Sequence, residues 1–174
     1  FALSATLTFE QTYSEVEGDS AAVAELVAIL SSLANAPIHQ YLAVTGSVNQ
    51  LGEIQPIGGV NEKIEGFFES CQKRGLTGKQ GVLIPAKNIR HLALNREVVE
   101  AAEMGKFSIF GVNTLEEALE LLTGVPAGET TPEGHYPPST IFGQVARRLT
   151  EMANIAAEWG ERRHASKSSD HSTQ

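Results

Sequence analysis

The chain has very little cysteine, no long apolar stretch and few basic residues. Cys71 is the only cysteine among 174 residues, so no internal disulfide can form, and we expect a cytoplasmic setting. No run approaches the roughly 20 apolar residues of a membrane span, and residues 1–15 lack the pattern of an export signal. Thirteen Lys and Arg against 21 Asp and Glu give a formal net charge of −8, which argues against nucleic acid or anionic membranes as the main partner.

Motifs for two common kinds of ligand are also missing. The five histidines show no metal-ligand spacing, so we expect no metal site. They are His39, His91, His135, His164 and His171. The pattern GxxxxGK[ST] does not occur, so we do not expect this chain to bind ATP through a phosphate loop. Cys71 falls on the apolar face of a predicted helix, and we interpret it as a core residue.

What the sequence does contain is an alternation of helix and strand patterns, which predicts one α/β (α+β) domain. Residues 3–13 alternate in the manner of a strand, and their abrupt start suggests a piece of a longer chain. The other predicted strands cover 41–48, 53–57, 81–85 and 107–112, and the predicted helices cover 20–36, 61–74, 97–103 and 114–122. The first of these helices is apolar nearly all round, so we expect it to be buried. Asp19 and Thr114 are suitable N-caps by residue type.

The composition changes after Gly124, where the core domain (residues 1–124) is predicted to end. The segment VPAGETTPEGHYPPST holds four of the seven prolines and indicates a linker. Residues 140–159 follow as one amphipathic helix, and the polar residues after Trp159 are expected to be disordered. The appendage therefore covers residues 125–174.

Two residues at predicted helix starts have types that fit hydrolysis. Ser20 opens the first helix and Lys63 lies in the first turn of the second. A serine becomes a nucleophile when an adjacent base removes its proton, and lysine can do this only while its amine is neutral. We expect apolar neighbours of Lys63 to exclude water and favour that neutral form. Free N–H groups at a helix start could also stabilise an oxyanion. From the pattern alone the ordinary interpretation is the more common one, because serines at helix starts are mostly caps and lysines on helix surfaces are mostly solvated.

The segments EGDSAAVAEL, VTGSV and QPIGGVNEKIEGF resemble the proteolytic domain of the Lon family of ATP-dependent proteases, over about residues 3–124. In that family the nucleophilic serine follows a Gly-Asp or Gly-Pro step, and the base lysine follows PxGG within GGxxEK. The matching positions here are Ser20 and Lys63, which are 43 residues apart. The Gly-Asp-Ser form is more similar to the Lon-B-like branch and its bacterial relatives than to the general bacterial Lon, which usually has proline before the serine.

The resemblance also implies supporting residues. Thr45 matches a threonine that holds the lysine amine by a hydrogen bond. Asp19 next to the serine would favour the charged amine, so we hypothesise that it helps to hold a resting state; its alternative interpretation is a simple N-cap. Glu17 could shape the loop or the substrate cleft, or be an ordinary exposed carboxylate. Gly58 and Gly59 are expected to allow the turn that presents Lys63.

The function implied by the resemblance is the proteolytic part of an ATP-dependent serine endopeptidase that acts on unfolded or damaged proteins. ATP and Mg²⁺ would act in a separate ATPase part, with no cofactor in this chain, and the partners would be protein substrates and further copies in a hexameric ring. Two alternatives come from other classes. One is a non-catalytic assembly or substrate-binding module of an AAA+ remodelling protein, which the presence of both Ser20 and Lys63 disfavours. The other is a small-molecule kinase, which would need a glycine-rich phosphate loop where this chain has EGDSAAVAE.

Overall fold

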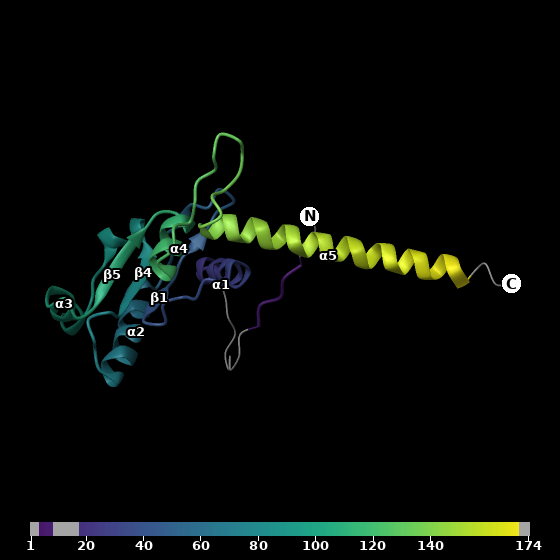
Figure 1. Cartoon of the computed structure of the whole chain (residues 1–174). Coiled ribbons are helices and arrows are strands. Elements are labelled where there is room, and N and C mark those ends of the chain that lie inside the picture. Colours follow the sequence, from purple (N-terminus) through teal and green to yellow (C-terminus); the bar gives the residue numbers. More distant parts are fainter. Residues whose placement is uncertain (1–3, 9–17, 171–174) are drawn as a thin grey trace.

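A three-stranded parallel sheet lies at the centre of the computed structural model, which describes residues 4–8 and 18–170 (Figure 1). The strands are β1 (Leu42–Val44), β4 (Gly81–Pro85) and β5 (Ser108–Val112), in the order β1-β4-β5. A two-stranded antiparallel sheet, β2 (Ser47–Val48) and β3 (Ile54–Gln55), lies beside it. All five residues of β4 are buried, as expected for a central parallel strand with both faces covered.

Helices cover both faces of this sheet. They are α1 (Ala22–Ala34), α2 (Val60–Arg74), the 3-10 helix η1 (Ala86–His91), α3 (Arg96–Glu103), α4 (Leu115–Thr123) and α5 (Ile141–Asp170). Successive β4 side chains point to opposite faces. Val82 and Ile84 therefore join a core with α2 and α3, whereas Leu83 joins the core formed with α1, α4 and α5. The predicted α/β class is confirmed.

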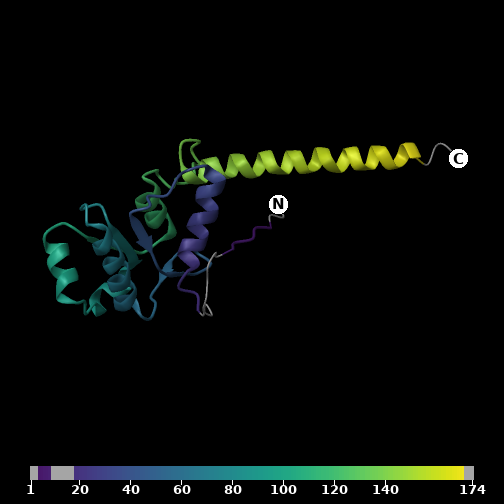
Figure 2. The same ribbon diagram turned by 90° about the horizontal axis from the view of Figure 1, so that it is seen from below.

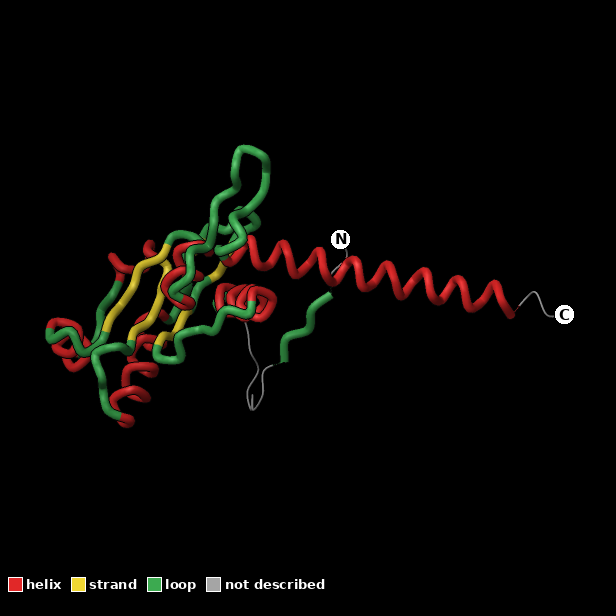
Figure 3. Tube along the Cα trace, viewed as in Figure 1, coloured by secondary structure: helices red, strands yellow, loops and turns green. Residues whose placement is uncertain are grey.

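Two strand predictions need correction. The strand expected over 41–48 divides at Thr45 and Gly46, so β1 and β2 belong to different sheets. Residues 4–8 form a loop apart from the sheet (Figure 3), so the strand expected over 3–13 is wrong there; its other residues lie outside the described part. An alternating pattern forms a strand only where a neighbouring strand accepts and donates its backbone hydrogen bonds. Residues 4–8 have no such neighbour in the described structure, and all five are exposed.

Helix α1 differs from its prediction at its start and in its burial. It ends as predicted, at a left-handed Asn35 before Pro37. Its N-cap is Ala21, which makes no side-chain cap hydrogen bond, so the interpretation of Asp19 as a simple N-cap is wrong. Only one stripe of the helix is buried, namely Val23, Val27 and Ala34. The remaining apolar side chains are mostly half-exposed, because α4 and α5 cover only part of the helix surface.

The starts of the next helices show two kinds of cap. Helix α2 begins after Gly59, which has a φ of 66°, and not at Asn61 as predicted. The Asn61 side chain is used elsewhere, since its Oδ1 accepts a hydrogen bond from the Ala93 N–H at 3.0 Å. Helix α4 begins as predicted, with the Thr114 hydroxyl accepting a hydrogen bond from the Glu117 N–H at 3.3 Å.

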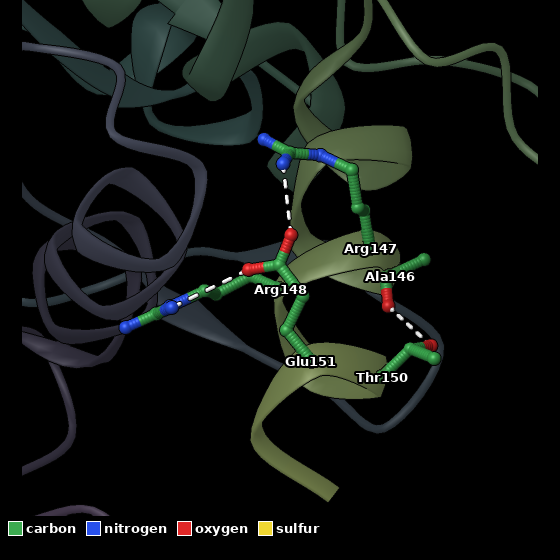
Figure 4. A network of polar contacts seen from close by, with 5 residues as sticks. All are labelled: Ala146, Arg147, Arg148, Thr150 and Glu151. Atoms are coloured by element: carbon green, nitrogen blue, oxygen red, sulfur yellow. Dashed lines mark hydrogen bonds and ion pairs between the residues drawn. The ribbon is translucent and has the colours of Figure 1, made fainter. Parts of the chain in front are cut away.

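The C-terminal helix α5 packs at its start and then projects from the body (Figures 1 and 2). Ile141 and Val145 are buried against the core that includes α1. On the exposed side, Arg147 and Arg148 both bond to Glu151, at 2.9 and 3.4 Å (Figure 4). The helix predicted over 140–159 is thus present. Its backbone stays helical to Asp170, further than predicted, and the last four residues of the expected tail lie outside the described part.

Candidate active site

Three elements bring Ser20, Thr45 and Lys63 together at one end of the parallel sheet. Ser20 precedes α1, Thr45 follows β1, and Lys63 lies in the first turn of α2. The Lys63 amine lies 2.7 Å from the Ser20 hydroxyl oxygen and 3.4 Å from the Thr45 hydroxyl oxygen. The first distance is that of a good hydrogen bond, whereas the second is long. The two residues singled out as nucleophile and base are therefore in direct contact.

Backbone hydrogen bonds fix Ser20 against the end of β1. The Ser20 carbonyl accepts from the Gly46 N–H at 2.8 Å and from the Thr45 hydroxyl at 3.1 Å. In return, the Gly46 carbonyl accepts from the Val23 N–H at 3.1 Å. A side chain at Gly46 would begin only 3.1 Å from Val23 and 3.2 Å from Ile54, so glycine permits this close approach.

The turn before α2 places Lys63 in this arrangement. Gly59 adopts the left-handed conformation that favours glycine, as the sequence predicted for this turn. The preceding Ile57 is held at both backbone groups by the buried Asn88: its N–H donates to Asn88 Oδ1 at 3.0 Å, and its carbonyl accepts from Asn88 Nδ2 at 2.9 Å. Sequence analysis did not identify Asn88, because a single asparagine before a predicted loop carries no signal of a contact 31 residues away.

The dry surroundings expected around Lys63 are not present in the described structure, where this residue is exposed. The apolar neighbours expected to exclude water were Val60, Ile64 and Phe67. Val60 and Ile64 are buried and Phe67 is half-buried, but all three pack in the core beneath α2. Residues one turn away on the same helix contact the stem of a long side chain such as lysine. They do not reach past it to cover the terminal amine. The prediction that these residues wall off water is therefore wrong.

Thr45 lies where a positioning residue could act. It is only 8% exposed, and its hydroxyl donates to the Ser20 carbonyl while accepting from the Lys63 amine. A single hydroxyl group thus connects the backbone of one candidate residue to the side chain of the other. Its role in holding the lysine remains a prediction from the resemblance.

Asp19 and Glu17 have different outcomes. The Asp19 carboxylate accepts a hydrogen bond of 2.6 Å from the Ser47 hydroxyl, and within the described residues it forms no ion pair with Lys63. Ser47 is a site neighbour that sequence analysis missed, since it was part of a predicted strand. Glu17 lies outside the described residues. The first-turn N–H groups of Ala22 and Val23 already donate to the Asp19 and Gly46 carbonyls, and neither is available to an oxyanion.

Other chemistry receives no support from the part of the chain that the structure describes. There, no group of three or more His, Cys, Asp or Glu side chains could hold a metal ion. No helix in residues 18–170 is both long and apolar enough to cross a membrane. Burial raises the pKa of the Cys71 thiol, with Arg74 opposing this effect. A thiol with a raised pKa is a poorer nucleophile at neutral pH. Cys71 is only half-buried and belongs to neither core cluster of the described residues, so its interpretation as a core residue needs correction.

Comparison with known proteins gives one family. Residues 14–123 match the Lon protease (S16) C-terminal proteolytic domain. The chain is 58% identical over 131 residues to a "Putative Lon protease homolog" of Escherichia coli K12, covering 74% of this chain and 22% of that protein. It is 50% identical over 121 residues to the protein of the same description from Haemophilus influenzae, covering 70% of this chain and 20% of that protein. It is 39% identical over 113 residues to the "Archaeal Lon protease" of Thermococcus kodakarensis, covering 65% of this chain and 16% of that protein. The chain thus spans about a fifth of the length of these relatives, and α5 lies beyond the family match.

Proposed function

This chain belongs to the family of Lon proteolytic domains, and from that membership we propose that it is a serine endopeptidase in which Ser20 is the nucleophile and Lys63 the base. The observation that carries the proposal is the 2.7 Å contact between the Lys63 amine and the Ser20 hydroxyl. A nucleophile and a base within hydrogen-bond reach are the minimum that acyl transfer requires.

The proposed reaction has two stages. The Ser20 oxygen attacks the scissile carbonyl while the neutral Lys63 amine accepts the hydroxyl proton. The resulting ammonium gives that proton to the leaving amine, and the peptide bond breaks to leave an ester on Ser20. A water molecule then hydrolyses this ester, with Lys63 again accepting a proton and returning it to Ser20.

This mechanism requires a neutral amine. Because Lys63 is exposed, something must exclude water from its amine before reaction. Excluding water from a lysine disfavours its charged form. We therefore propose that a bound substrate, or a neighbouring copy of the chain in a ring, covers Lys63 before reaction. A separate ATPase part, using ATP and Mg²⁺, would deliver unfolded protein to the site. When no substrate is bound, Asp19 would help to hold the site in its idle state.

The test is cleavage of casein or a fluorogenic peptide by the intact protein with ATP. We expect Ser20→Ala and Lys63→Ala each to remove cleavage, since each deletes one half of the pair. Ser70→Ala and Lys73→Ala are matched controls, because both residues are exposed on the same helix as Lys63. These controls should cleave at the wild-type rate. Undiminished cleavage by both Ser20→Ala and Lys63→Ala would refute the assignment.

The exposed Lys63 keeps one alternative function open, a substrate-binding or assembly module without peptidase activity. In that case no condition would produce cleavage, yet the protein would still bind unfolded polypeptides or assemble. Binding of unfolded casein to the Ser20→Ala variant, measured alongside cleavage by the wild type, separates the two functions.

A further inference from the structure

A second feature, a cavity with two basic residues in its lining, lies at the same edge of the parallel sheet as the Ser20–Lys63 pair. A cavity of about 590 Å³ opens where β4 and β5 end, lined by Ala86, Lys87, Ile89, Arg90 and Asn113. The carboxyl ends of parallel strands lie at one edge of a sheet, and this edge is where open α/β sheets bind ligands. Thr45, at the carboxyl end of β1, belongs to the same edge.

Local geometry brings two positive charges together at this cavity. Lys87 and Arg90 are three residues apart in η1, and side chains with this spacing eclipse one another in a 3-10 helix. The Arg90 Nε–H donates to His91 Nε2 at 3.1 Å, which orients the guanidinium group. Neither Lys87 nor Arg90 forms an ion pair within the described part of the chain, although the protein as a whole carries a formal charge of −8. Two adjacent unpaired cations repel each other, and a ligand carboxylate would relieve that repulsion.

The other walls of the cavity fit a peptide better than a bare anion. Ile89 is 48% exposed and lies over Gly111, where a side chain would begin 2.2 Å from its Cδ1 atom. This isoleucine offers an apolar contact beside the two charges. The nearby Glu117 carboxylate accepts a hydrogen bond from the Asn113 N–H at 2.7 Å.

The cavity and the proposed active site are built on shared parts. The Asn113 carbonyl accepts from the Ile54 N–H at 2.7 Å, and Asn88 of η1 holds Ile57. Residues 54–57 therefore run between the cavity and the glycine turn that leads to Lys63. A polypeptide chain extends about 3.3 Å per residue, so the inference requires a substrate long enough to reach from the Ser20–Lys63 pair to this cavity.

We propose that Lys87 and Arg90 form a subsite for an acidic residue, Asp or Glu, of a polypeptide substrate, with Ile89 contacting an apolar neighbour of that residue. This inference rests on the proposed function, because it names a preferred class of substrate for the same site. It extends that function by giving the protein a selection rule based on charge.

The test measures binding separately from cleavage. In the Ser20→Ala variant, fluorescence anisotropy compares a labelled peptide rich in Asp, Glu and Leu with a twin in which Asn and Gln replace the acids. We expect the acidic peptide to bind about five- to tenfold more tightly at 50 mM salt, as for two exposed charge pairs, with the preference shrinking at higher salt. Lys87→Ala with Arg90→Ala should reduce the preference to about one.

A control with the same charge change is available at the other end of the same two strands. Lys79 and Lys106 are exposed and lie just before the amino ends of β4 and β5, so Lys79→Ala with Lys106→Ala removes two positive charges at the opposite edge. This control should keep the preference. Reversing both charges, with Lys87→Glu and Arg90→Glu, should transfer the preference to a peptide rich in lysine.

The outcomes separate this proposal from the proposed function. Equal binding of the two peptides, or an equal loss of preference in the Lys79/Lys106 control, would overturn the subsite. Loss of cleavage in the Ser20→Ala variant of the intact protein is measured independently and tests only the catalytic pair. A preference in binding that appears also in the relative kcat/KM of the two peptides would support both.

Discussion

Replacing Thr45 with valine removes one hydroxyl group from the centre of the candidate site while keeping the shape of the side chain. The hydroxyl donates to the Ser20 carbonyl at 3.1 Å and accepts from the Lys63 amine at 3.4 Å. Neither partner becomes a buried orphan on substitution. The Ser20 carbonyl keeps the Gly46 N–H at 2.8 Å, and the exposed Lys63 amine can bond to water.

These contacts set the expected size of the effect on stability. One ordinary hydrogen bond contributes about 0.5–1.5 kcal/mol, and no additional penalty for an unsatisfied buried group applies. The long contact to an exposed amine adds little. We therefore expect Thr45→Val to lower the free energy of unfolding by about 1 kcal/mol, which lowers Tm by about 2–4 °C in a chain of this length.

Activity should respond more strongly than stability if Thr45 positions Lys63. A displacement of about 1 Å in a reacting group can cost about 100-fold in rate, so we expect kcat to fall about 10- to 100-fold with KM little changed. Peptide cleavage by the intact protein and thermal unfolding of the same preparations provide both numbers. Thr45→Ser keeps the hydroxyl and should recover most of the activity. Wild-type kcat for Thr45→Val, or an equal defect in Thr45→Ser, would refute the positioning role.

Three further predictions concern single residues elsewhere. Thr114→Ala removes the side-chain cap of α4 and should cost about 1 kcal/mol in urea unfolding, with Thr114→Ser as the control that retains a hydroxyl. Gly59→Ala should cost about 1–2 kcal/mol because Gly59 has a positive φ of 66°, whereas Gly58→Ala should cost less because Gly58 has no positive φ; space for the added Cβ is available at both positions. Burial raises the pKa of the Cys71 thiol while Arg74 lowers it, so the thiol should react with a disulfide reagent at pH 8 more slowly than free cysteine. Arg74→Gln should slow this reaction further, and a faster reaction would contradict the stated cause.

Local signals predicted the elements that depend on local interactions. The apolar run 81–85 became β4 and the Thr114 cap began α4, because both patterns express preferences within a few residues. The division of the strand at Gly46 depends instead on Val23 and Ile54, which approach it from other elements. No pattern within residues 41–48 contains that information.

The candidate site shows the same distinction. Residue types at helix starts allowed Ser20 and Lys63 only as possibilities, and the family resemblance paired them before any distance was known. Their surroundings were predicted wrongly, because apolar residues near Lys63 in sequence turned inward to the core and left its amine exposed. Asn88 and Ser47 were missed since each acts through a contact about 30 residues away.

The separation of Ser20 and Lys63 along the chain also has a consequence for folding. The two side chains meet across 43 residues, and Thr45 between them is tied to Leu83 of β4 by the hydrogen bond of its N–H to the Leu83 carbonyl, at 3.0 Å. Parallel pairing of β1 with β4 needs a long loop to close first, and such non-local contacts form slowly. We expect the pair to assemble only after residue 85 has been synthesised and the sheet has formed. A growing chain on the ribosome would then carry no reactive serine while its own unfolded segments are nearby.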